Sequence, residues 1–104
     1  MSFLLFYITV PDKVTGQNLG KGCLQNRLAA CYNLFPISSQ FWWQEKLEES
    51  EEWVLLLKTA HHRKEDLSTF IHQHHPYQVP CIMFWTVEVN PTYSDWIVKE
   101  TSTT

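Results

Sequence analysis

The sequence has little glycine, no basic excess and no long hydrophobic run, and each shortage excludes a class of protein. Its three glycines all lie within residues 16–22 and fail the phosphate-loop pattern, because Gly22 stands where Ser or Thr must hold Mg²⁺. Lys and Arg number 8 against 11 Asp and Glu, a formal net charge of -3, which disfavours a nucleic-acid partner. No apolar run reaches the roughly 18 residues of a membrane span, so no membrane partner is expected.

Cysteine is also sparse, and its number is odd. Cys23, Cys31 and Cys81 have no paired spacing, which argues against a disulfide framework and favours a reducing compartment. The apolar run at residues 3–10 lacks a basic flank and a small-residue cleavage site, so we interpret it as a strand rather than a signal peptide. These features predict a cytoplasmic protein.

What the sequence does have is aromatic surface. Five Trp, four Tyr and six Phe stand in only 104 residues, and they must fill a core or an interface. The length and an apolar fraction of 44% predict a single domain over residues 1–104.

The hydrophobic pattern predicts a regular succession of strands and helices. Residues 3–10 form an apolar strand with the features of a central strand buried on both faces. A helix from residue 13 to residue 30 follows, with Asp12 as its N-cap, although three glycines weaken it. Residues 31–35 read as a short strand stopped by Pro36. Residues 37–47 and 53–59 form a hairpin, and the charged residues 48–52 are its turn.

The second half continues the pattern. Leu67, Phe70, Ile71 and His74 occupy one face of a helix that ends before Pro76. Residues 80–89 form the last strand. A short helix then starts at Asn90-Pro91, and residues 101–104 are a frayed tail.

This order, β-α-β-β-α-β-α, predicts an α+β fold: a ferredoxin-like split β-α-β sandwich with an extra C-terminal helix. The helices of such a fold cover one face of the sheet. The other face needs a partner, and the aromatic strands and long hairpin favour a second copy of the chain.

Five sequence blocks, in order and in register, carry a family resemblance. They are Leu28-Ala-Ala-Cys-Tyr-Asn33, Ser39-x-Phe41-x-Trp43-x-x-Lys46, Leu57-Lys-Thr59, His75-Pro-Tyr-Gln-Val-Pro80 and Asn90-x-x-Tyr93-x-x-Trp96-Ile97. Together they resemble the CutA family of divalent-cation tolerance proteins over nearly the whole chain. The chain departs from the family pattern at several positions. Phe41 replaces Tyr, Glu45 replaces Gly, and Gln78 stands where Glu is frequent. The first helix carries three glycines where the family is rich in Ala, and Ile8 stands where some bacterial members have Cys.

The resemblance implies a homotrimer, with sheets facing inward and hairpins reaching across, similar in architecture to the PII signalling proteins. It also implies a non-enzymatic protein that binds copper or a similar divalent ion reversibly. The alternative is a PII-like signalling or interaction module for which metal is incidental. By analogy alone, Lys46, Lys58 and Tyr77 could line an anion pocket between subunits.

The resemblance places a copper site at His74 and His75. Neutral imidazoles suit copper, and the adjacent cluster His72-Gln-His-His75 supplies them. Ile8 in place of a Cys ligand removes the soft thiolate of such a site. The competing interpretation is structural: His74 as a core histidine bonded to a backbone carbonyl, and His75 as the end of the helix.

Other candidates carry less weight. His61-His62 reads as a solvated helix start, and residues 48–52 as a solvated acidic turn. A hydrolase that uses Cys31 or Cys81 as its nucleophile is the weakest alternative, because a buried Cys is ordinarily a small apolar residue.

Overall fold

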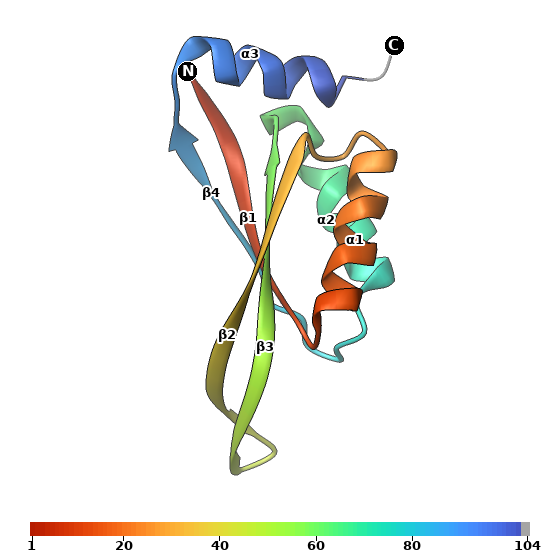
Figure 1. Cartoon of the computed structure of the whole chain (residues 1–104), viewed down its shortest axis with the longest axis vertical. Helices are drawn as coiled ribbons and strands as arrows, with labels where there is room; N and C mark the ends of the chain where they lie inside the picture. Colours follow the sequence, from red (N-terminus) through yellow and green to blue (C-terminus); the bar gives the residue numbers. More distant parts are fainter. Residues whose placement is uncertain (103–104) are drawn as a thin grey trace.

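The computed structural model describes residues 1–102 and places one antiparallel sheet beside three helices (Figure 1). The strands are β1 (Ser2–Val10), β2 (Cys31–Trp43), β3 (Lys46–Thr59) and β4 (Ile82–Glu88). The helices are α1 (Lys13–Gln25), α2 (Lys64–His74) and α3 (Pro91–Glu100), with a short 3₁₀ turn at His61–Arg63 before α2. The sheet order is β2-β3-β1-β4, which confirms the predicted α+β succession and places β1 in the centre.

The core lies between the sheet and the pair α1 and α2. Leu4, Phe6, Ile8 and Val10 alternate along β1 and face these helices, because successive strand residues point to opposite faces. On the other face Phe3 is buried, whereas Leu5, Tyr7 and Thr9 keep partial exposure. The prediction that β1 is buried on both faces therefore holds only for its helix-covered face within one chain.

Helix α3 differs from the expectation that the helices share one face. It packs against Phe3 and Val87, which lie opposite one another in the β1–β4 ladder on the face turned away from Phe6. Tyr93 and Ile97 supply the apolar side of α3. In Figure 1, α3 crosses one end of the sheet, so the remainder of that face is uncovered. We call this uncovered remainder the open face.

Helix α1 begins where predicted and ends five residues early. The Asp12 carboxylate accepts the Thr15 amide at 2.7 Å, and this hydrogen bond holds the pKa of Asp12 below its usual value. At the other end, Arg27 adopts a left-handed φ of 57°, and the Leu28 amide donates to the Cys23 carbonyl at 2.9 Å. This reversal closes the helix, so residues 26–30 are a connection and not helix.

The hairpin corrects two further predictions. Pro36 does not stop the strand: β2 runs through it, because β2 is an edge strand that tolerates the missing N–H. Residues 48–52 are not the turn but part of β3. The turn is Gln44-Glu45, with φ values of 50° and 65°, which are typical of a two-residue hairpin turn. Gly adopts positive φ most readily, which agrees with the Gly that the family resemblance implies at the position of Glu45.

The remaining boundaries fall close to their predicted positions. Helix α2 ends before Pro76, and β4 starts at Ile82, so Cys81 lies just outside it. Asn90 precedes α3 as predicted, but its side chain bonds the Thr92 hydroxyl at 2.8 Å rather than capping a backbone amide. No helix within residues 1–102 has the length and apolar character needed to cross a membrane.

Two glycines of α1 offer a matched test of how closely this helix packs. A Cβ at Gly20 would lie 2.8 Å from the Tyr32 ring, whereas a Cβ at Gly22 would lie 3.0 Å from the tip of the Phe70 ring. We expect Gly20→Ala to destabilise the fold by about 1–2 kcal/mol, because overpacking outweighs the gain in helix propensity of about 1 kcal/mol.

Gly22→Ala is the control, since the end of the Phe70 side chain has room to yield. Urea denaturation of both variants measures the difference. Equal stabilisation by both substitutions would show that α1 is free to move away from β2.

Candidate functional site

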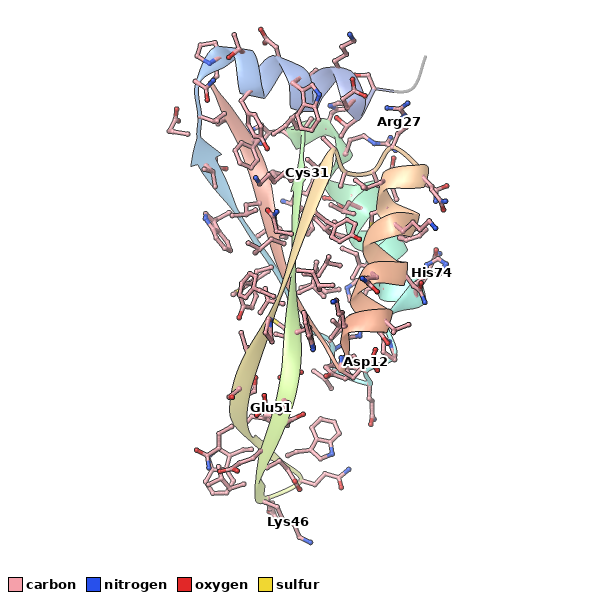
Figure 2. The ribbon with its side chains drawn as sticks, viewed as in Figure 1. Asp12, Arg27, Cys31, Lys46, Glu51 and His74 are labelled. Atoms are coloured by element: carbon pink, nitrogen blue, oxygen red, sulfur yellow. The ribbon has the colours of Figure 1, made fainter. Side chains whose placement is uncertain are left out.

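His74 lies at the end of α2 on the side of the helices turned away from the sheet (Figure 2). Its ring stacks on Phe70 with ring centres 4.1 Å apart, and its Nδ1 lies 2.8 Å from the Phe70 carbonyl oxygen. A carbonyl only accepts hydrogen bonds, so Nδ1 carries the proton and Nε2 keeps its lone pair. The ring is exposed, which rules out the core position considered from sequence but agrees with the predicted backbone hydrogen bond.

His75 has left the helix and adopts an extended backbone. Its Nδ1 accepts the Tyr77 amide at 3.0 Å, so the ring proton sits on Nε2, which donates to the Thr9 carbonyl at 2.8 Å. Both nitrogens are therefore engaged. The ring ties the loop after α2 to the end of β1.

The structure thus gives the two predicted ligands different states. His74 presents a free lone pair outward, whereas His75 has none to offer without giving up the Tyr77 amide. Ile8, at the position where the resemblance implies a Cys ligand in some bacterial members, is fully buried in the core. Within residues 1–102, no three His, Cys, Asp or Glu side chains are grouped closely enough to hold a metal ion. The metal site at His74 and His75 stays a prediction.

The two residues of the other histidine pair, His61 and His62, also differ in their surroundings. His61 places its Nε2 2.9 Å from the Ser2 hydroxyl, at the start of the 3₁₀ turn, and His62 is exposed. This arrangement agrees with the solvated helix start expected from sequence.

A groove on the open face is the feature that sequence reasoning missed. It runs between the hairpin and the segment after α2, and its walls include Tyr7, Ile37, Glu52, Tyr77 and Cys81. At its floor the Tyr77 hydroxyl donates to the Glu52 carboxylate at 2.6 Å, and Glu52 is only 6% exposed. Three carboxylates line the groove, and no Lys, Arg or His does.

The buried Glu52 carboxylate shifts the pKa of two neighbouring side chains. Burial, then the hydrogen bond to Glu52 and its negative charge, raise the pKa of the Tyr77 hydroxyl far above its usual value. Burial and the Glu52 charge also raise the pKa of the Cys81 thiol. Cys23 in the core has its pKa raised to about 12 by burial. Cys81 and Cys23 therefore lack the thiolate character that a nucleophile requires.

Lys58 stands near the opposite end of the open face. Its Nζ donates to the Tyr93 hydroxyl at 3.2 Å and lies 5.4 Å from the centre of the Tyr93 ring. Lys46 is at the hairpin tip (Figure 2), twelve positions along the same strand and roughly 40 Å away. The Tyr77 hydroxyl is engaged in its hydrogen bond to the Glu52 carboxylate. The anion pocket considered for Lys46, Lys58 and Tyr77 is therefore not assembled within one chain.

Comparison with known proteins identifies the family. The model described as CutA1 divalent ion tolerance protein matches residues 4–100. The divalent-cation tolerance protein CutA of Pyrococcus horikoshii is 37% identical over 99 residues, which span 94% of this chain and 97% of the relative. The corresponding protein of Thermotoga maritima is 33% identical over 95 residues, with coverages of 90% and 94%.

Solved structures agree with the sequence relatives. CutA from Archaeoglobus fulgidus superposes with a TM-score of 0.91 at 32% identity, covering 98% of this chain and 100% of that chain. CutA1 from Oryza sativa superposes with a TM-score of 0.88 at 31% identity, with coverages of 98% and 94%. Sequence blocks, strand order and superposition lead to one conclusion: the chain belongs to the CutA1 family of non-enzymatic divalent-ion tolerance proteins.

Proposed function

We propose that this protein is a homotrimer that binds copper or a similar divalent metal ion reversibly, with His74 as the principal ligand and His75 as a secondary one. The proposal combines the family's divalent-cation role with the two features of the chain that need an external partner. These are the open face of the sheet and the outward lone pair of His74.

The open face supports the trimer. Phe35, Phe41, Met83 and Trp85 project from it while remaining exposed in the single chain. The long hairpin carries further aromatic side chains and projects beyond the rest of the chain. The whole chain measures 46 Å along its longest axis. A contiguous apolar surface of this kind marks an interface in a protein of this size. Two further copies supply the cover.

The observation that carries the metal proposal is the hydrogen bond from His74 Nδ1 to the Phe70 carbonyl. Histidines that bind metals ordinarily donate their other ring N–H to a carbonyl or carboxylate, which fixes the tautomer and orients the free nitrogen. His74 fits this description, and imidazole nitrogen is a good ligand for copper. His75 fits only if it releases the Tyr77 amide, so it contributes less.

Calorimetric titration with Cu(II) tests the assignment. We expect His74→Ala to weaken copper binding at least about tenfold, a loss of about 1.4 kcal/mol or more, because it removes the free lone pair. The wild-type protein is expected to bind copper with a defined stoichiometry, and the double variant His74→Ala/His75→Ala is expected to lose this binding.

His62→Ala is the matched control, since it removes an exposed histidine of the same chain and leaves α2 intact. Copper affinity that is unchanged in the double variant would show that both histidines are structural. The PII-like alternative would then gain weight. Its specific support is Trp42, which is 73% exposed near the hairpin tip and free to contact a partner protein.

We also propose a cytoplasmic location, supported by the free state of Cys23, Cys31 and Cys81. The Archaeoglobus fulgidus relative is described as periplasmic, so location is not uniform in the family.

A further inference from the structure

The open face holds two charged side chains that form no ion pair with any other of residues 1–102. Glu52 is buried and accepts one hydrogen bond, from the Tyr77 hydroxyl. Lys58 is half-buried and donates to the Tyr93 hydroxyl. The ion pairs formed among residues 1–102 include neither of them.

Both charges are incompletely compensated by what surrounds them. Buried carboxylates are ordinarily paired with a cation or accept several N–H groups, because desolvation otherwise costs several kcal/mol. The same reasoning applies, more weakly, to a half-buried ammonium group whose described partners are a phenol hydroxyl and its ring. Within residues 1–102, each group therefore lacks an opposite charge in contact with it.

Glu52 and Lys58 cannot satisfy one another inside a single chain. Both belong to β3 and point to the open face, as the pairing of Glu52 with Ile37 and of Lys58 with Cys31 shows. They lie six positions apart, which amounts to roughly 20 Å along the strand. They thus form two separate patches of opposite charge on one face.

We propose that Glu52 of one copy pairs with Lys58 of the next when three open faces meet, and that this repeated ion pair sets the register of the assembly. The inference rests on the proposed trimer and names the residues that orient it. In a closed ring, each copy contacts its two neighbours through two different patches, so every Glu52 obtains one Lys58.

The composition of the face favours Lys58 over any other cation of a second copy. Among the strand residues that share this face, the only other cation is Lys46. Lys46 is exposed at the hairpin tip, so its ammonium group is open to solvent. The groove around Glu52 contains carboxylates and no cation of its own chain, which suits an ammonium group arriving from outside.

A double-mutant cycle on trimer dissociation tests the pair. Glu52→Gln preserves the shape and the Tyr77 hydrogen bond, and Lys58→Met preserves the aliphatic stem. We expect each single variant to raise the dissociation constant about 30-fold or more, because it leaves one buried charge unpaired. The double variant dissociates far less readily than the product of the single effects predicts. Reversing either charge alone, by Glu52→Lys or Lys58→Glu, is expected to weaken assembly. Combining the two reversals in one chain is expected to restore it.

Lys46→Met and Glu51→Gln are the controls, because they neutralise exposed charges of the same strand that do not line the groove; both are expected to leave dissociation unchanged. Additive effects in a protein that remains trimeric would overturn the ion pair and leave the trimer standing. A monomeric wild-type protein would overturn the trimer itself.

Carbodiimide coupling of the wild-type protein provides a second measurement that needs no variant to fold. This reagent joins a carboxylate to an amine that it contacts. Mixed heavy-isotope and normal copies identify coupling between chains. The pair predicts a Glu52–Lys58 product between copies, and coupling of Lys58 to a different carboxylate would contradict it.

Discussion

Replacing Met83 by Glu is expected to convert the proposed trimer into monomers. Met83 lies on β4 opposite Tyr7, on the open face, and is 46% exposed in the single chain. The new carboxylate remains hydrated in the monomer, so the fold of one chain is little affected. In the trimer the same carboxylate is buried among apolar side chains without a partner, which costs several kcal/mol at each of the three contacts. Light scattering reads the mass directly.

The control for this prediction is Val14→Glu. Val14 is 63% exposed on α1, on the other side of the molecule from the open face. The same charge added there leaves the trimer mass unchanged. A trimer that survives Met83→Glu would show that this part of the open face is not an interface.

Replacing Phe6 by Ala is expected to cost about 3–5 kcal/mol of unfolding free energy. Phe6 is fully buried in the central strand, pairs with Leu57 across the ladder and stacks on Phe84 with ring centres 5.0 Å apart. Truncation leaves a cavity between the sheet and the helices that the surrounding strands cannot fill. Guanidinium denaturation measures the loss.

This measurement is made at one fixed protein concentration, because the stability of an oligomer depends on concentration. Val14→Ala is the control, and a surface change of this kind stays within about 0.5 kcal/mol. A loss below about 1 kcal/mol for Phe6→Ala would mean that the core between β1 and the helices does not hold the fold together.

The order of elements was predictable from sequence because its signals are local. The apolar strand at β1, the cap at Asp12 and the proline after α2 each act on their own segment. The hairpin was misjudged because its turn, Gln44-Glu45, lacks the Gly or Asn that ordinarily marks positive φ. The acidic run beside it therefore looked like the turn.

The site was predictable only in its residue types. The histidine cluster indicated imidazole chemistry, but the state of each ring depends on acceptors far away in sequence, such as the Thr9 carbonyl for His75. Glu52 was missed because it was grouped with its charged neighbours. Its place two residues before Val54, in a strand of alternating burial, was the available signal.

Sedimentation equilibrium of the wild-type protein tests whether two further copies of the chain cover the open face. A trimer gives a single species of about three times the chain mass of 12.3 kDa, stable to dilution into the nanomolar range. A single species at the mass of one chain would contradict it, because the open face and the charges of Glu52 and Lys58 would then be left without their partners.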